Sequence, residues 1–179
     1  MTDKANNWLK PEEALSRFKK PENVLLNKQE SVFTEQALRY GFVINNMGFL
    51  IAENTLSEVV KNTKIYPIPH TKTWMRGLIN LRGNLVPVYD FCLLLGLSNE
   101  KSQYDNLLVL GKDSHSVGLI IDNIPKSYDI GDWQKLVQIP YHLAGLEDHV
   151  INAYSYEDII WMDFNHEDYF ESIKDQVVV

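Results

Sequence analysis

Cysteine is nearly absent from the chain. The one cysteine, Cys92, lies in the apolar run Phe91–Leu95, so no disulfide can form within the chain, and we predict a buried small hydrophobic side chain rather than a nucleophile. Long apolar runs are absent as well. Residues Met1–Lys20 contain no stretch typical of a signal-peptide core, and no later run is long enough to cross a bilayer. We therefore expect the protein to stay in the cytoplasm.

The patterns that mark many catalytic sites are also missing. The sequence has no Gly-rich phosphate loop that ends in Lys-Ser or Lys-Thr, and no Gly-x-Ser-x-Gly. It lacks a second cysteine to complete a zinc site, and no two histidines are spaced as metal ligands on one helical face. The histidines are His70, His115, His142, His149 and His166. We therefore predict no catalytic residues, no cofactor and no metal.

Positive charge is in deficit. The 17 lysine and arginine residues stand against 24 aspartate and glutamate residues, which gives a formal net charge of -7 and a pI of about 5.2. The resulting field repels phosphate backbones and anionic lipid, so roles on nucleic acid or on a membrane surface are disfavoured. A hydrophobic content of 45% is typical of a folded chain, and 179 residues suffice for one ordinary domain or for two small barrels that share a core.

Short apolar segments separated by turn residues dominate most of the chain. Their length and spacing predict a sandwich or small-barrel architecture rather than a parallel α/β sheet. The first two segments, Tyr40–Ile44 and Phe49–Ile51, are separated by Asn45, Asn46 and Gly48 and predict a hairpin. The other predicted strands are Lys64–Ile68, Gly77–Leu81, Leu85–Tyr89, Leu107–Leu110, Val117–Ile121, Pro125–Ile130, Val150–Tyr154 and Ile159–Met162.

Longer helical patterns are confined to the two ends of the chain. Residues Pro11–Lys20 predict a short amphipathic helix, with the proline in its first turn and Pro21 after its end. Residues Asp163–Lys174 predict a terminal amphipathic helix with the aspartate as its N-cap.

Two further features lie in the middle of the chain. Asp90 can cap a short helical turn, and Gly96 can close it. The polar segment 98–105 follows, and its composition makes it the best candidate for a connection between two subdomains.

The segment from Trp74 to Asp90 predicts a tight hairpin. Two apolar runs flank Gly83-Asn84, a pair that can adopt the positive φ angles of a tight turn, and this places Arg82 at the hairpin end. Pro87 cannot donate a ladder hydrogen bond, so we expect an edge or a bulge in the second strand.

This same segment resembles the signature of the CheW-like family. The resemblance rests on Trp-Met-Arg-Gly-Leu-Ile-Asn-Leu-Arg-Gly at 74–83, Leu-Val-Pro-Val-Tyr-Asp at 85–90 and Leu-Leu-Gly-Leu at 94–97. Further stretches that resemble the family are Leu50–Ala52, Leu56–Val60, Tyr66–Pro69 and Ser116–Asp122, so that the match covers about Gln36 to Phe164. The long lead before residue 36 and the acidic tail around 167–175 resemble the PilI-like, twitching-motility members more than a minimal flagellar member.

The resemblance implies a mainly β, CheW-like fold. Its members have two five-stranded β-barrels of the Src-homology-3-like kind around a shared hydrophobic core, and we expect short helices at the termini. The implied parts are an N-terminal extension with a short helix over 1–35, the CheW-like domain over 36–165 and a C-terminal helical tail over 166–179.

The resemblance also implies a non-catalytic adaptor. In the family, one barrel meets the regulatory domain of a CheA-type histidine kinase, and a groove between the barrels receives the hairpin tip of a methyl-accepting chemoreceptor. We therefore expect these two partners, no nucleic acid, no membrane insertion, and recruitment from the cytoplasm to membrane-associated receptor arrays.

The candidate receptor- or kinase-binding residues are Leu56, Glu58, Trp74, Gly77 and Arg82. The resemblance implies all of them except Trp74, which we add because a partly exposed aromatic beside Gly77 can supply apolar surface for an interface. The resemblance pairs Glu58 with Arg82 as a salt bridge near the receptor groove. Local interpretations of both residues remain open. Thr55-Leu56-Ser57-Glu58 also fits a capping box at a helix start, and Arg82 fits a solvated charge at a hairpin end.

The other three residues have structural interpretations too. Leu56 can be a core leucine, and Gly77 can be a glycine that backbone geometry requires. Trp74 can serve as a partly exposed interface anchor or as a core aromatic.

Other functions remain open at this point. A small enzyme could use Asp122, Asp90 or His115, although nothing in the sequence brings them together. A kinase-inhibiting or kinase-coupling protein that has lost receptor binding is a further alternative, and the residues of the receptor groove would distinguish it. Within the family, the output could be flagellar chemotaxis rather than twitching motility.

Overall fold

The computed structural model describes residue 13 and residues 38–100, 102–103, 106–138, 143 and 145–179. The predicted helix over Pro11–Lys20 therefore lies outside the described residues apart from Glu13, as does the rest of the predicted extension over 1–35. The fold described below belongs to the unit Gln36–Val179.

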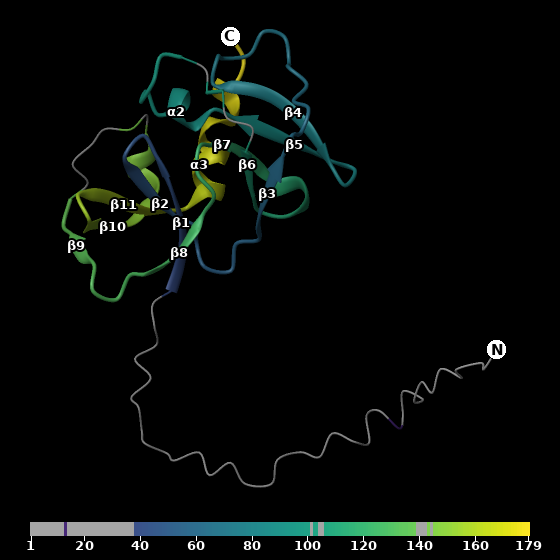
Figure 1. The fold of residues 1–179 in the computed structure, drawn as a ribbon. Helices are drawn as coiled ribbons and strands as arrows, with labels where there is room; N and C mark the ends of the chain where they lie inside the picture. The colour runs from purple at the N-terminus through teal and green to yellow at the C-terminus, as the bar shows by residue number, and fades with distance from the viewer. Residues whose placement is uncertain (1–12, 14–37, 101, 104–105, 139–142, 144) are drawn as a thin grey trace. The chain divides into compact units, whose positions relative to one another are not determined.

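The chain folds into two β-sheets with short helices (Figure 1). The strand order is β8-β1-β2-β11-β10-β9 in a six-stranded sheet and β3-β6-β7-β5-β4 in a five-stranded sheet. The six-stranded sheet contains β1 (Leu38–Ile44), β2 (Met47–Leu50), β8 (Lys126–Asp129), β9 (Gln134–Leu136), β10 (Val150–Tyr156) and β11 (Ile159–Phe164). The five-stranded sheet contains β3 (Ser57–Lys61), β4 (Met75–Leu81), β5 (Asn84–Tyr89), β6 (Asn106–Leu110) and β7 (Val117–Ile121). The helices are α2 (Phe91–Leu94), α3 (His166–Ile173), and the 3-10 helices η1 (Asp113–His115), η2 (Leu146–His149) and η3 (Lys174–Gln176).

The mainly β, two-sheet prediction is confirmed, with differences at the sheet edges. One sheet has six strands rather than five, because the short polar strand β9 pairs with β10. Strand β3, which was not among the predicted strands, pairs along its whole length with β6. The strand predicted over Lys64–Ile68 is reduced to a single bridge between Tyr66 and Leu78. Pro67 and Pro69 lack the N–H groups that a longer ladder would need.

The chain passes between the two sheets twice. A first crossover, residues 51–56, joins β2 to β3, and a second crossover, residues 122–125, joins β7 to β8. The prediction that 98–105 connects two subdomains is therefore wrong, because that segment lies between the two crossovers and joins α2 to β6, and the strands before and after it, β5 and β6, belong to the same sheet. The backbone N–H and the hydroxyl of Ser102 donate hydrogen bonds to the buried Asp90 carboxylate at 2.7 and 2.8 Å, so this polar segment satisfies a buried charge.

The predicted shared core lies between the sheets. Strand β6 has both faces buried, with Leu108 and Leu110 in the shared core and the alternate residues Leu107 and Val109 in the interior of the five-stranded sheet. The interior of the six-stranded sheet contains a separate cluster around Trp161. Helix α3 lies between the two sheets (Figure 1) and adds three further side chains to the shared core, Tyr169, Phe170 and Ile173.

The two predicted hairpins are present, one of them in a shifted register. In the β1–β2 hairpin, Asn45 and Asn46 occupy the turn with φ angles of 44° and 66°. In the β4–β5 hairpin the turn residues are Arg82 and Gly83, with φ angles of 53° and 92°, and not Gly83-Asn84. The Gly83 N–H donates to the Asn80 side-chain oxygen at 2.9 Å, which favours this register.

The helix caps were predicted correctly for α2 and incorrectly for α3. Asp90 caps α2 by accepting from the Leu93 N–H, and Gly96 follows the helix with a φ of 70°. Helix α3 is capped by Asn165 instead of Asp163. Asp163 lies within β11, where its carboxylate is buried.

Candidate functional site

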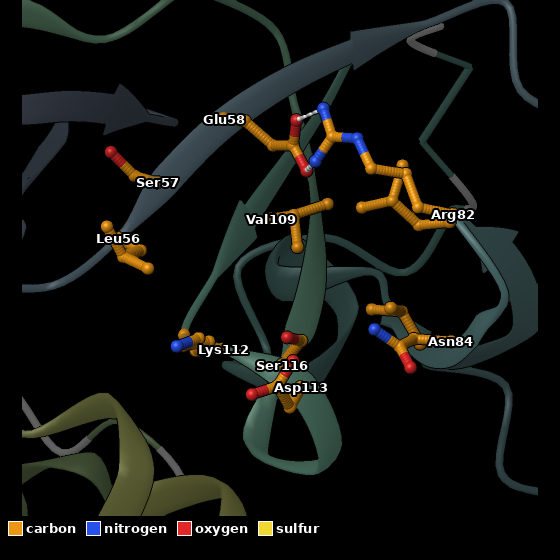
Figure 2. A pocket seen from close by; sticks show the side chains of 12 residues that line it. Leu56, Ser57, Glu58, Arg82, Asn84, Val109, Lys112, Asp113 and Ser116 are labelled. Carbon is orange, nitrogen blue, oxygen red and sulfur yellow. Dashed lines mark hydrogen bonds and ion pairs between the residues drawn. The ribbon is translucent and has the colours of Figure 1, made fainter.

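A surface groove of about 410 Å³ lies at one end of the five-stranded sheet, and we call it the Glu58–Arg82 groove. Three parts of the chain line it: the start of β3, the tip of the β4–β5 hairpin and the connection from β6 to β7. Figure 2 shows the groove, which is lined by Leu56, Ser57, Glu58, Leu81, Arg82, Asn84, Val86, Val109, Gly111, Lys112, Asp113 and Ser116.

The groove has an apolar floor and a charged rim. Val86 and Val109 are buried in the interior of the five-stranded sheet and reach the base of the groove. Lys112 and Asp113 are exposed at the rim. A partner side chain that enters can therefore bury apolar surface and keep polar contacts at the edge.

Glu58 and Arg82 form the predicted salt bridge. Arg82 Nη1 donates to Glu58 Oε1 at 2.9 Å and Nη2 donates to Oε2 at 2.7 Å, so the contact is bidentate (Figure 2). The side chains are 75% exposed for Arg82 and 34% for Glu58, and an exposed pair contributes only about 0–1 kcal/mol to stability. The alternative of a helix cap at Glu58 is wrong, because Ser57 to Lys61 form a strand.

Leu56 joins this pair in the groove. It ends the first crossover with 60% of its surface exposed, which contradicts the core interpretation. The Leu56 carbonyl accepts a hydrogen bond from the Gly111 N–H at 2.9 Å, which ties the crossover to the β6–β7 connection.

Gly77 and Trp74 lie outside the groove. Gly77 is buried with a φ of 133°, and a Cβ atom there would lie 2.1 Å from the Tyr66 carbonyl oxygen, so backbone geometry requires glycine. Trp74 is half-buried against the shared core, with its ring 6.0 Å from that of Tyr89. The structure thus brings together three of the five predicted residues.

The sequence prediction missed the contribution of the β6–β7 connection. Gly111 has a φ of 90°, and its backbone turns the chain so that Lys112, Asp113 and Ser116 line the groove. The signal was present, because a glycine followed by polar residues separates two apolar runs at this point.

The three candidate catalytic groups do not form one site. His115 precedes β7 and Asp122 follows it, so they lie at opposite ends of that strand. Asp90 is fully buried and binds the Arg76 guanidinium at 3.0 Å.

A second cavity, of about 440 Å³, includes Cys92 and Asp122 in its lining. Burial, together with the nearby carboxylates of Asp90 and Asp122, raises the pKa of the Cys92 thiol to about 11. A thiol of this pKa stays protonated near neutral pH, which disfavours nucleophilic chemistry.

Within the described ranges, no cluster of three or more His, Cys, Asp or Glu side chains could hold a metal ion. Across those same residues, no helix has the length and apolarity needed to span a membrane.

The fold and the groove define a binding module built on two β-sheets. The chain belongs to the CheW-like family, since the model of the CheW-like domain matches residues 40–155. Its fold is similar to that of the scaffolding protein TtCheW from Thermoanaerobacter tengcongensis, with a TM-score of 0.58 and 22% identity over 76% of this chain and 93% of that one.

Curated relatives include both CheW and PilI proteins. The chain is 28% identical over 149 residues to the chemotaxis protein CheW of Helicobacter pylori, which covers 77% of this chain and 89% of that protein. It is 25% identical over 83 residues to CheW of Thermotoga maritima, covering 46% of this chain and 55% of that protein. It is 34% identical over 86 residues to PilI of Pseudomonas aeruginosa, covering 47% of this chain and 48% of that protein. The chain thus spans about half the length of the last two relatives.

Proposed function

We propose that the chain is a non-catalytic adaptor that couples methyl-accepting chemoreceptors to a CheA-type histidine kinase in a chemosensory array. The observation that carries the proposal is the Glu58–Arg82 groove, in which an exposed leucine and a bidentate ion pair surround an apolar floor. A groove of this size accepts one or two side chains of a partner. Modest contacts suffice in an array, because neighbouring contacts raise the effective concentration of each partner.

Exposed apolar side chains near the two crossovers support a receptor surface that extends beyond the groove. The first crossover begins at Ile51, whose N–H donates to the Tyr40 carbonyl, and the second leads into β8, which pairs with β1. Both crossovers therefore meet β1. The exposed apolar residues of this region are Leu38, Tyr40, Leu56 and Ile124. We propose that a helical receptor tip packs on them and that Leu56, Glu58 and Arg82 fix its position.

Trp74 and Gly77 enter the proposal in supporting roles. The half-buried Trp74 ring is a candidate contact for the receptor or the kinase regulatory domain. Gly77 is proposed to act through its backbone, by allowing β4 to approach Tyr66 closely.

The proposed pathway is the control of type IV pili in twitching motility, with the protein in the cytoplasm and recruited to membrane-associated arrays. The likeness to PilI over 86 residues supports this pathway. Flagellar chemotaxis is the alternative, and the likeness to CheW of Helicobacter pylori supports it. Deletion of the gene should abolish twitching and leave swimming intact, and the wild-type gene should restore twitching. A deletion that impairs only swimming would contradict the pilus pathway.

Co-precipitation tests the adaptor itself. The purified chain should retain both a receptor cytoplasmic tip and a kinase regulatory domain, and it should bridge the two when neither binds the other. Folded Arg82→Asp protein should lose the receptor tip and keep the kinase domain. A wild-type chain that retains neither partner would overturn the proposal.

A further inference from the structure

Arg39 and Asp163 form a buried ion pair across the six-stranded sheet. Arg39 Nη2 donates to Asp163 Oδ1 at 2.8 Å and Nη1 donates to Oδ2 at 3.2 Å. Arg39 is 9% exposed and Asp163 is 5% exposed. The pair connects β1 to β11, which are not neighbours, because β2 lies between them. None of the residues lining the Glu58–Arg82 groove belongs to this pair.

The same guanidinium holds the first crossover, residues 51–56. Arg39 Nη2 donates to the carbonyl oxygen of Ile51, the first crossover residue, at 3.0 Å, and Nη1 lies 3.8 Å from the carboxylate of Glu53. At its other end the crossover is held by the hydrogen bond from Gly111 to the Leu56 carbonyl. Strand β3, which carries Glu58, follows directly.

We infer that Arg39 is a positioning residue for partner binding: it fixes the first crossover and thereby presents Leu56 and Glu58 at the groove. The inference rests on the proposed function and adds to it a buried residue, whose side chain lies on the face of β1 opposite to the exposed Leu38 and Tyr40. A buried ion pair is often no more stabilising than apolar residues of similar volume. A planar guanidinium, however, can bind a carboxylate and a carbonyl at once in one fixed geometry, which apolar residues cannot do.

The double variant Arg39→Met/Asp163→Leu separates positioning from stability. It removes both charges and fills the space with apolar side chains, so neither partner stays buried and unpaired. Arg39→Lys is a second variant. Lysine keeps the positive charge but lacks the planar guanidinium that donates to both Asp163 and Ile51. Arg76→Met is the matched control, because Arg76 also pairs with a buried carboxylate but contacts Ser102 instead of the crossover.

Two measurements on the full chain test the inference. Calorimetry gives the Kd for the purified cytoplasmic hairpin of a receptor encoded in the same genome, and amide hydrogen exchange reports protection of the Gly111 N–H. In the folded double variant we expect binding to weaken about fivefold to tenfold and Gly111 to exchange faster. Arg39→Lys should show the same changes to a smaller extent. Arg76→Met should lower the unfolding midpoint but change neither the Kd for the receptor hairpin nor the exchange of the Gly111 N–H.

Wild-type affinity or wild-type exchange in the folded double variant would overturn the inference and leave Arg39 with a role in stability alone. Failure of the wild-type chain to bind the receptor hairpin would instead count against the proposed function. The exchange of Gly111 would still decide whether Arg39 holds the crossover.

Discussion

Arg82 combines an uncommon backbone conformation with a side-chain contact. Its φ of 53° is unusual for a residue with a side chain, and the glycine after it shares the turn. In this position the guanidinium projects from the hairpin tip and reaches Glu58 on β3, on the far side of the groove. The turn therefore places the ion pair at the groove rim.

Charge reversal tests that pair. Arg82→Asp would bring two carboxylates together, and we expect receptor binding to weaken more than about fivefold, beyond what an exposed pair contributes to stability. Adding Glu58→Lys should restore part of the affinity, so the double change costs less than the sum of the single changes. Titration calorimetry of both single variants and the double variant completes the cycle. Additive losses would show that the two residues act independently.

Gly77 offers a prediction about backbone space. Gly77→Ala would place a Cβ 2.1 Å from the Tyr66 carbonyl at a φ of 133°, so we expect a loss of about 3 kcal/mol or more in the free energy of unfolding. Gly83→Ala is the matched control, because Gly83 also has a positive φ but nothing lies within 4 Å of its Cβ position. That control should cost only about 1 kcal/mol. Urea denaturation measures both, and equal losses would contradict the steric explanation.

Sequence reasoning reached some of these residues and not others. The pairing of Glu58 with Arg82 followed from a family motif and is present. The pairing of Arg39 with Asp163 joins residues 124 positions apart with no motif at either end, so local spacing could not reveal it. Lys112, Asp113 and Ser116 line the groove because of where the folded β6–β7 connection lies, and the sequence alone does not reveal that position.

At the scale of secondary structure, the central strands were easiest to predict. Strands β6 and β7 are buried on both faces and appear in the sequence as continuous apolar runs. Strands β3 and β9 lie at sheet edges, where half-exposed polar residues remove that signal. The end of β11 was mistaken for a helix start, because a buried aspartate in an ion pair has the same local pattern as an N-cap.

Helix α3 carries a pH-dependent contribution to stability. His166, its first residue, is buried, and burial lowers its pKa below the ordinary value of 6.5. As the pH falls below 6.5, His166 binds a proton in the unfolded chain before it does so in the folded chain. The free energy of unfolding therefore decreases until the pH reaches the lower pKa of His166 in the folded state. The decrease from this one group is at most about 1.4 kcal/mol per pH unit.

His166→Gln should flatten the dependence of the unfolding free energy on pH between about pH 5 and 7, the range below the unfolded pKa of a histidine. Urea melts at several pH values measure it. His115→Gln is the control for the replacement of a histidine by glutamine, because His115 is exposed. If the His166 variant keeps the wild-type slope, the buried imidazole is not the responsible group.

At the scale of the whole domain, the two sheets are built to fold together. The shared core contains residues of both sheets and of α3, and the chain crosses between the sheets twice. The six-stranded sheet does not form from a continuous segment, because it combines residues before and after the whole five-stranded sheet. The five-stranded sheet is continuous in sequence, but it contributes Leu108 and Leu110 to the shared core and would expose them without the other sheet. The two halves should therefore lack independent stability.

We accordingly expect one cooperative unfolding transition for the residues in the sheets. Trp133 and Trp161 lie in the cluster enclosed by the six-stranded sheet, so fluorescence in a Trp8→Phe/Trp74→Phe background reports on that sheet, whereas far-ultraviolet circular dichroism reports on both sheets. The two midpoints in urea should coincide.

Two core substitutions test the coupling between the sheets. Phe91→Leu in the shared core and Ile79→Val in the cluster enclosed by the five-stranded sheet should each shift both midpoints together. A fluorescence transition that does not move with Ile79→Val would show that the six-stranded sheet unfolds alone and that the shared core does not couple the two sheets.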